Sequence, residues 1–353
     1  MTSTDVTSTE QAAIPITRPI LPQSARLNMS FDSERLIADV ERLGRTTWML
    51  QRSFADDGTV TEAEVDWRCR PLRSVAGEAD RTDPGGPGLD EFADTPWLRS
   101  APYLAEVLSS IPAQLRSARL LALGPGVSSW EHLDTKYGPA WGTARLHVPI
   151  TTTPGALLYL EDTAHHWESG ALWFADFSRL HRVENTDSVT RVHLVVDTLV
   201  CEELIELFPE NYLRQATPDD VLFNRAPVAL TPAEAAASCR VRCDLPDSFV
   251  NWEEQDGAFI VDDSWFHATI ETCGSRVVLL REGRPVLGLT HIGDGEFRFA
   301  GWTDERTLQI AHTPNSTSVT LRTRRGSRVW ETTIPAQTLA PLSPPAASTG
   351  HTD

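Results

Sequence analysis

The sequence is poor in positive charge and almost without lysine. Lysine and arginine together number 31 against 49 aspartates and glutamates, so the net charge at pH 7 is −18. Lys136 is the single lysine. A protein that binds nucleic acid needs clustered basic side chains to neutralise phosphates. The charge therefore argues against nucleic acid and against anionic membrane surfaces as partners.

Cysteines and long apolar runs are also scarce. The sequence contains five cysteines, Cys69, Cys201, Cys239, Cys243 and Cys273, and none of them forms a Cys-x-x-Cys pair. An odd count without a signal peptide indicates a reducing compartment, so we expect a cytoplasmic protein. No segment approaches the roughly 18 apolar residues that a membrane helix needs, so we expect no membrane partner.

Histidine, by contrast, is concentrated in one part of the chain. Six of the ten histidines lie between Trp130 and Asp197. There, His132 and Asp134 form a His-x-Asp pair, and His181 provides a distant second imidazole. Two imidazoles and one carboxylate on one face of a metal, with the other face open, are the ligand set of non-haem Fe(II) oxygenases. The spacing predicts such a centre.

An arginine follows at a suitable distance. The metal positions that the protein leaves open accept a bidentate 2-oxo acid and then dioxygen. A planar guanidinium holds a carboxylate through two parallel charge-assisted bonds. Arg191, ten residues beyond His181, therefore fits the role of binding the far carboxylate of the 2-oxo acid.

The segment from about Leu120 to Asp197 is typical of successive short strands. The expected strands, each bounded by turn residues or charges, are Arg145–Ile150, Ala156–Leu160, Gly170–Phe174 and Arg191–Asp197. A double-sheet jelly roll of the cupin kind, with a ligand cavity inside, is built in this way. We therefore expect a mainly β fold with flanking helices.

Strand alternation also predicts which side chains line that cavity. Arg145 shares a face with His147, and Arg191 shares a face with His193, so the four side chains can point into one interior. His132 and Asp134 share a face if their segment is extended. His193 has two interpretations, a cavity-lining group or a packed histidine bonded to the backbone.

The series PG…HxD…RLHVPI…GALWF…H…N…R-x-HLVVD resembles the aspartyl/asparaginyl β-hydroxylase family of Fe(II)/2-oxoglutarate dioxygenases, and within it the bacterial branch that includes L-proline cis-hydroxylases. The resemblance covers roughly Trp67 to Asp197. It implies Fe(II) as the metal, 2-oxoglutarate as co-substrate and O2 as oxidant. One departure is Leu121, where some members have a hydroxyl residue.

The resemblance also implies residue roles. His132, Asp134 and His181 become the iron ligands and catalytic residues, and Arg191 becomes the partner of the 2-oxoglutarate side-chain carboxylate. The remaining cofactor-binding positions, near the chelating end of 2-oxoglutarate or in the same cavity, are Arg145, His147 and His193.

Each piece also has a simpler explanation. A lone His-x-Asp pair is common by chance, and His181 could be a surface histidine. Arg191 could pair with Glu184 or Asp187. The order and spacing of the whole set favour the metal centre over these alternatives. His165 and His166, in a polar loop without ligand spacing, are expected to be solvated or part of a substrate lid.

The substrate is less well defined by the sequence. The resemblance implies hydroxylation of an unactivated C–H bond of an amino acid, a peptidyl aspartate or a small polar natural product, in bacterial secondary metabolism such as antibiotic biosynthesis. Candidate substrate contacts, chosen for nearness to the iron groups, are Trp130, Lys136, Trp141 and Glu161. For Lys136 the alternative is a solvated loop lysine.

Other functions use the same scaffold. A non-catalytic cupin that binds a ligand would keep the barrel, but it would not need both Arg191 and a complete ligand triad. Desaturases and epimerases keep the same iron ligands. A halogenase needs the carboxylate position vacated for a halide, and Asp134 argues against it.

The chain divides by composition into five parts. Residues 1–24 and 337–353 are expected to be disordered, 25–215 to form the oxygenase jelly roll, 216–237 a linker and 238–336 an accessory β domain. Within 25–215, helices are expected at Asp32–Leu43 and Tyr103–Arg116, and a mobile loop that could act as a lid is expected at Ala76–Gly88.

The part from Ser238 onward consists of short alternating runs separated by turns, typical of a small β-sandwich or barrel. Hairpins are expected around Glu282-Gly283 and Arg325-Gly326. Structural support, substrate binding or homodimerisation is the role we expect for it. Because every proposed ligand lies upstream, a chain ending near Ala216 is expected to keep iron and 2-oxoglutarate binding.

Overall fold

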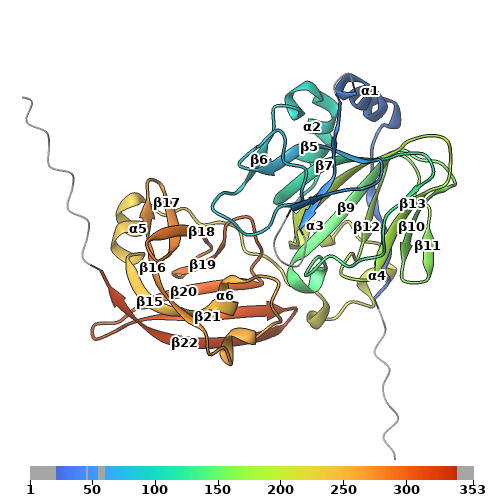
Figure 1. Ribbon diagram of the computed structural model, residues 1–353. Helices are drawn as coiled ribbons and strands as arrows, with labels where there is room; N and C mark the ends of the chain where they lie inside the picture. The colour runs from blue at the N-terminus through green and yellow to red at the C-terminus, as the bar shows by residue number, and fades with distance from the viewer. Residues whose placement is uncertain (1–20, 45–46, 55–59, 340–353) are drawn as a thin grey trace, which may run out of the picture.

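The structure is a computed structural model that describes residues 21–44, 47–54 and 60–339. It contains two β assemblies, a two-sheet jelly roll and a closed barrel (Figure 1). The expected mainly β class, with a jelly roll followed by a second β unit, is confirmed. Among the described residues, no helix is long and apolar enough to cross a bilayer.

The jelly roll consists of a large and a small sheet. The large sheet contains, in spatial order, β1 (Ser24–Ser30), β12 (Ala171–Ala175), β9 (Thr143–Thr151), β14 (Arg191–Leu199), β7 (Leu115–Leu123), β5 (Trp67–Val75) and β2 (Met49–Leu50), with β6 (Phe92–Asp94) paired to β5. The small sheet contains β11 (Thr163–His165), β10 (Ala156–Leu160), β13 (His181–Asn185) and β8 (Val127–Ser128). A separate hairpin joins β3 (Arg52–Phe54) to β4 (Val60–Glu62).

The second assembly is a closed antiparallel barrel. Its strands are β15 (Val241–Pro246), β16 (Trp265–Cys273), β17 (Arg276–Arg281), β18 (Arg284–His291), β19 (Glu296–Phe299), β20 (Arg306–His312), β21 (Thr317–Arg325) and β22 (Arg328–Thr338). The helices of the chain are α1 (Ser33–Leu43), α2 (Pro102–Ser110), α3 (Glu202–Ile205), α4 (Glu210–Leu213), α5 (Pro232–Ser238) and α6 (Asp247–Val250). Single 3-10 turns are η1 (Leu98–Ser100), η2 (Pro139–Trp141), η3 (Pro218–Asp220) and η4 (Ala258–Ile260).

The large sheet is covered on both faces, which explains the sequence of its central strand β14. All nine residues of β14 are buried. Val192, Leu194 and Val196 belong to the core that also includes residues of α1 and α2, while Arg191 and His193 alternate to the opposite face. The alternation thus gives one strand a hydrophobic side under the helices and a polar side that faces the small sheet.

The helix expected at Asp32–Leu43 is confirmed, with Asp32 as its N-cap. The Asp32 Oδ1 atom accepts hydrogen bonds from the backbone N–H groups of Glu34, at 3.0 Å, and Arg35, at 3.1 Å. These bonds satisfy two of the N–H groups that a helix start leaves without partners.

The expectation of a helix through Arg116 was wrong at its C-terminal end. The helix α2 ends at Ser110, and Arg116 lies on strand β7. Pro112 has no N–H group to donate within a helix, and it pushes Ile111 toward the extended conformation that Ile111 adopts (φ −73°, ψ 118°). The proline therefore separates the helix from the strand.

The two expected hairpins of the barrel are confirmed. Glu282 and Gly283 both have positive φ, 51° and 76°, between the paired residues Arg281 and Arg284. Two central residues with positive φ match the right-handed twist of the flanking strands, and glycine takes that conformation without steric cost. In the second hairpin the pair Arg325–Arg328 flanks Gly326.

The parts expected to be disordered lie almost wholly outside the described residues. Of the described residues in those ranges, Ser24 begins strand β1, and residues 337–338 end strand β22. The loop 76–88 is described. The backbone N–H group of Gly88 donates to Ala300 O at 3.1 Å, and Gly288 donates to Gly88 O at 2.8 Å, so the end of this loop is fastened to the barrel.

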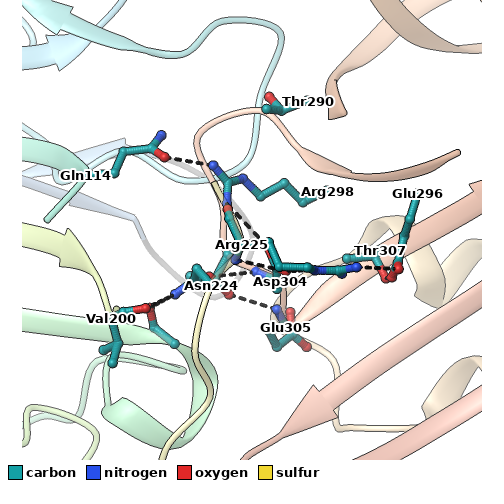
Figure 2. A network of polar contacts seen from close by, with 12 residues as sticks. Gln114, Val200, Asn224, Arg225, Thr290, Glu296, Arg298, Asp304, Glu305 and Thr307 are labelled. Carbon is teal, nitrogen blue, oxygen red and sulfur yellow. Dashed lines mark hydrogen bonds and ion pairs between the residues drawn. The ribbon is translucent and has the colours of Figure 1, made fainter. Parts of the chain in front are cut away.

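Residues between the two assemblies form a polar network (Figure 2). The Asn224 side-chain amide donates to Gly142 O at 2.8 Å and to Val200 O at 3.0 Å in the jelly roll, and its Oδ1 atom accepts from Asp304 N of the barrel at 2.8 Å. Next to it, the Arg225 Nε atom donates to Asp304 Oδ2 at 2.7 Å. The segment that joins the two assemblies is therefore bonded to both.

Candidate functional site

An isolated bridge between His132 and the first residue of β13 brings His132 and His181 together. The two residues form an isolated antiparallel bridge, with His132 N donating to His181 O at 2.9 Å and His181 N donating to His132 O at 2.7 Å. Two residues later, Asp134 N donates to Phe177 O at 2.9 Å. These backbone bonds bring the His132–Asp134 segment next to His181, 47 residues later in the sequence.

The hydrogen bonds of the two imidazoles fix which nitrogen is available. His132 Nδ1 lies 3.0 Å from Trp130 O, and His181 Nδ1 lies 2.8 Å from Arg179 O. A carbonyl oxygen only accepts, so each Nδ1 carries the proton and each Nε2 keeps a free lone pair. Burial lowers the pKa of His181 to about 4, which keeps it neutral at pH 7, as a metal ligand must be.

The ligand atoms of His132, Asp134 and His181 all lie within 4.8 Å of one another. His132 Nε2 is 3.9 Å from Asp134 Oδ1. Two neutral imidazole nitrogens and one carboxylate oxygen, gathered at one point with the remaining side open to a cavity, match the donor set of a non-haem Fe(II) centre. The group could hold a metal ion.

The Asp134 carboxylate is bonded to Arg145, which is in turn bonded to a second carboxylate, that of Asp197. Arg145 on β9 donates to Asp134 Oδ2 through Nη1, and it also binds Asp197, with Nε to Oδ1 at 2.6 Å and Nη2 to Oδ2 at 3.2 Å. Arg145 and Asp197 face each other directly in the β9–β14 register. The family resemblance implied a place for Arg145 near the chelating end of 2-oxoglutarate, and in the structure its guanidinium contacts the Asp134 carboxylate.

Asp197 was not singled out from the sequence. It is 1% exposed, and it also accepts from Ser117 Oγ at 2.7 Å. Burial by itself disfavours its charged form, yet the guanidinium groups of Arg145 and Arg119 lower its pKa to about 2. Asp197 is therefore an anion at neutral pH that anchors Arg145.

We expect this pKa to appear in the acid stability of the protein. The folded pKa of Asp197 lies below its unfolded value of about 3.9. The ionised side chain thus contributes stability above about pH 4, and the contribution is lost as the pH falls toward 2. Asp197→Asn should lower the free energy of unfolding by about 3 kcal/mol at pH 7, and by progressively less between pH 4 and pH 2. Urea unfolding across this range measures the difference.

A matched control for this experiment is Asp66→Asn, since the Asp66 carboxylate pairs with Arg68 but is about half exposed. Its effect should be below about 1 kcal/mol. A destabilisation by Asp197→Asn that stays constant down to pH 2 would contradict the lowered pKa.

Deeper in the jelly roll, Arg191 forms a second polar cluster with two histidines. Arg191 Nη2 donates to His193 Nδ1 at 2.8 Å, and His147 Nδ1 lies 3.3 Å from the same atom. Of the four polar side chains that alternation assigned to one interior, Arg145, His147 and Arg191 line the cavity. His193 does not line it but is packed beside Arg191 and bonded to it.

This cluster has the features of an anion site. Arg191 is buried, and among the described residues no carboxylate forms an ion pair with it; burial lowers its pKa to about 9. Because His193 Nδ1 accepts from Arg191, the proton of His193 is on Nε2, which is buried without a hydrogen-bond partner among the described groups. A buried cation and a buried donor without partners are costly. A carboxylate in the cavity would satisfy the charge of Arg191, so this arginine fits the far end of 2-oxoglutarate.

One cavity of about 320 Å³ is lined by the three candidate metal ligands and by Arg191 and His147 of the second cluster. Its inner wall includes Arg119, Leu121 and Arg191 from the large sheet. The other lining side chains nearer the surface are Gln51, Trp67, Trp130, Leu133, Trp252 and Glu253. Trp252 and Glu253 come from the barrel, in the connection between β15 and β16. The second assembly therefore supplies part of the wall of the candidate site.

The four predicted substrate contacts are separated by the structure. Trp130 lines the cavity and is 51% exposed. Trp141 and Lys136 do not line it but lie along a neighbouring groove, and Lys136 is buried. Glu161, at the turn after β10, is exposed and bonded to the Gln23 side chain. Of the four, Trp130 is the one that faces the metal cluster.

The two histidines of the polar loop, His165 and His166, do not line the cavity. His166 Nδ1 lies 3.4 Å from Ala156 O. The site residues that the sequence analysis missed include Asp197, Arg119, Trp67, Trp252 and Glu253. Asp197 ends a strand already recognised, and a charged residue in phase with Arg191 and His193 was a usable signal. For Trp252 and Glu253 the sequence contains no signal.

Comparison with known proteins bears on the same region. A sequence model of the family described as aspartyl/asparaginyl beta-hydroxylase matches residues 56–200. The matched range contains His132, Asp134, His181 and Arg191, and it ends before the barrel. No curated protein sequence matches the chain.

Several solved structures share a partial similarity of shape. A 2OG-Fe(II) oxygenase family oxidoreductase from Burkholderia pseudomallei is 12% identical, with 48% of this chain and 80% of that one covered and a TM-score of 0.31. A Trichoplax adhaerens prolyl hydroxylase, in complex with a hypoxia inducible factor peptide fragment, is 10% identical, with 52% of this chain and 86% of that one covered and a TM-score of 0.34. AviO1 from Streptomyces viridochromogenes Tue57 is 13% identical, with 55% of this chain and 97% of that one covered and a TM-score of 0.33. Similarities at this level carry no weight in the assignment.

The family match and the donor set of the cavity agree. The cofactors of the family are Fe(II), 2-oxoglutarate and O2, and the cavity contains a His-Asp-His group that could hold the metal. Residues 56–200 thus match the aspartyl/asparaginyl β-hydroxylase family, and this match together with the His-Asp-His group identifies a 2-oxoglutarate-dependent dioxygenase.

Proposed function

We propose that this protein hydroxylates an unactivated C–H bond of an amino acid, a peptidyl aspartate or a small polar natural product, as an enzyme of bacterial secondary metabolism. His132, Asp134 and His181 bind Fe(II) in this proposal, and Arg191 binds the far carboxylate of 2-oxoglutarate. The observation that carries the proposal is one cavity with both a three-ligand cluster and a buried arginine that lacks a carboxylate partner among the described residues.

The chain's own residues have distinct tasks in this reaction. The backbone carbonyls of Trp130 and Arg179 orient the two imidazoles through Nδ1. Arg145, itself held by Asp197, orients the carboxylate of Asp134. Such supporting partners affect both ligand orientation and ligand basicity. Iron, when bound with 2-oxoglutarate and O2, supplies the oxidising power for the C–H bond.

The proposal is tested by anaerobic titration. Fe(II) is added to the full-length protein, followed by 2-oxoglutarate, and the visible absorption band of a metal–2-oxo acid chelate is recorded. We expect the band with the wild type, and succinate formation once O2 is admitted. Failure to bind Fe(II) would remove the hydroxylase assignment, whereas Fe(II) binding without succinate formation from any substrate would favour a non-catalytic cupin.

Related reactions are separated by their products. Assays against a panel of free amino acids, peptides and aminocyclitols show whether the product gains one oxygen atom, as in hydroxylation, or loses two hydrogens, as in desaturation. Asp134 occupies the position that a halogenase needs for its halide, so we expect no chlorinated product. The proposed substrate contacts in this reaction are Trp130, Trp67 and Trp252, whose indoles line the outer cavity.

A further inference from the structure

The loop that carries two of the three proposed iron ligands is joined to the barrel by a buried ion pair. Lys136, two residues after Asp134, donates from Nζ to Glu305 Oε1 at 2.8 Å. Lys136 is 6% exposed and Glu305 is fully buried. The only lysine of the chain is thus used in a contact between the two assemblies.

The backbone of the loop makes Lys136 an unusual position for a lysine. Lys136 has a φ of 59°, in the left-handed region, within a turn closed by Tyr137 N donating to Asp134 O at 3.1 Å. The Lys136 carbonyl accepts from Thr143 Oγ1 at 2.9 Å. A residue other than glycine keeps this conformation when the surroundings hold it there. Here the buried pair with Glu305 holds the side chain, and therefore the turn that includes Asp134.

Glu305 is itself fixed by its neighbours in the barrel. Its Oε2 atom accepts from Trp302 Nε1 at 2.9 Å, and its Oε1 atom is 3.5 Å from Arg306 Nη2. A carboxylate with several donors has a defined position, and the Trp302 ring also packs against Trp252, with centroids 4.7 Å apart. One buried glutamate therefore contacts the metal loop and is linked to the barrel's wall of the cavity.

Arg306 continues this link toward the cavity. Its Nη1 atom donates to three backbone carbonyls, those of Ser248, Phe249 and Asn251, at 2.8, 2.7 and 2.8 Å. These carbonyls immediately precede Trp252. The residue before Glu305, Asp304, belongs to the network around Asn224 and Arg225 shown in Figure 2. The two neighbours of Glu305 in the chain, Asp304 and Arg306, are therefore bonded to the segment that joins the assemblies and to the barrel segment before Trp252.

We propose that Glu305 is a positioning residue for the metal centre, which acts through Lys136 on the His132–Asp134 loop. The barrel then helps to keep the iron ligands in place. The proposal rests on the proposed function, since it concerns the same three ligands. It assigns to the barrel a role in the chemistry although all three ligands belong to the jelly roll.

The competing explanation is an ordinary structural ion pair. A buried pair that loses one partner leaves the other charge stranded, which destabilises a protein whether or not a metal site is near. The two explanations differ in what happens to metal affinity when both charges are removed. A structural pair predicts normal metal affinity in a folded variant without either charge, whereas a positioning pair predicts weakened affinity.

The experiment uses full-length protein and Co(II) as the probe, with the dissociation constant measured by calorimetry and the melting temperature of each metal-free protein measured beside it. The variants are Glu305→Gln, Lys136→Met and the double variant Lys136→Met/Glu305→Gln. The double variant leaves neither charge of the Lys136–Glu305 pair stranded, so it tests the proposal even where a single variant fails to fold. Arg306, 3.5 Å from Glu305, keeps its bonds to three backbone carbonyls, and Asp256, 3.8 Å from Lys136 Nζ, is partly exposed. The control is Arg276→Ala, which removes an exposed ion pair with Asp90 elsewhere between the two assemblies.

We expect Co(II) affinity to fall about tenfold or more in the folded single variants and in the double variant, and to remain unchanged in Arg276→Ala. A double variant that binds Co(II) as tightly as the wild type overturns the proposal, as do single variants with lowered melting temperatures but unchanged affinity. If the wild type itself does not bind Co(II), the assignment of the metal ligands fails first, and this inference fails with it.

Discussion

Replacing His181 with alanine is expected to abolish the turnover of 2-oxoglutarate and to weaken Fe(II) binding by more than about 100-fold. The His181 Nδ1–H group is held by Arg179 O, so Nε2 is the one nitrogen that it offers to a metal. Its backbone bridge to His132 does not depend on the imidazole, so the fold should be kept. Succinate formation and calorimetric metal titration measure the two effects, and circular dichroism checks the fold.

A matched control is His267→Ala, since His267 is an exposed histidine of the barrel that pairs with Asp244 and lies outside the cavity. It should retain wild-type turnover and metal affinity. Unchanged turnover in His181→Ala would refute the ligand assignment, because no other described histidine lies within ligand distance of both His132 and Asp134.

The site residues that could be predicted from the sequence are those whose positions follow from short spacings along the chain. The pair His132 and Asp134 and the ten-residue step from His181 to Arg191 were visible in the sequence. The alternation of β14 correctly placed Arg191 at the cavity, although His193 is packed behind it. Period-two alternation is a local property of each strand, so it survives without knowledge of strand pairing. The same reasoning recovered four strands of the jelly roll, β9, β10, β12 and β14, and two hairpins of the barrel.

The role of Arg145 depended on information that is not local. It faces Asp197 across two strands in a register fixed by the sheet, and it reaches Asp134 from the other side. A shift of the register by one residue would turn either side chain to the opposite face. Alternation alone thus placed Arg145 in the cavity but could not tell whether it binds a co-substrate or a ligand carboxylate.

The contribution of the barrel could not be predicted at all from the sequence. Lys136 and Glu305 are 169 residues apart, and Trp252 reaches the cavity because the two assemblies pack together. From the sequence, a chain ending near Ala216 was expected to keep iron and 2-oxoglutarate binding, since every proposed ligand lies upstream. The structure leads to the opposite expectation, because truncation removes Glu305 and exposes the buried ammonium group of Lys136.

Arg191→Lys is expected to raise the 2-oxoglutarate concentration for half-maximal turnover by about 10- to 100-fold, with a much smaller change in the apparent affinity for the substrate. A lysine keeps the charge, but a point charge cannot reproduce the two-pronged grip of a guanidinium on a carboxylate. It also has no planar group with which to bind His193 Nδ1 while holding an anion. Loss of one charge-assisted hydrogen bond, about 1.5–3 kcal/mol, corresponds to this factor.

The measurement is turnover as a function of 2-oxoglutarate and, separately, of substrate, and the matched control is Arg182→Lys. Arg182 lies on β13, one residue from His181, and its guanidinium pairs with Glu184 near the surface, so its replacement should leave both concentration dependences unchanged. A fall in substrate affinity without a change for 2-oxoglutarate would assign Arg191 to the substrate pocket. In that case the buried cation without a carboxylate partner among the described residues would mark the binding site of an anionic group on the substrate. The co-substrate would then be sought at Arg119 or Arg145, the two further arginines of the large sheet that line the cavity.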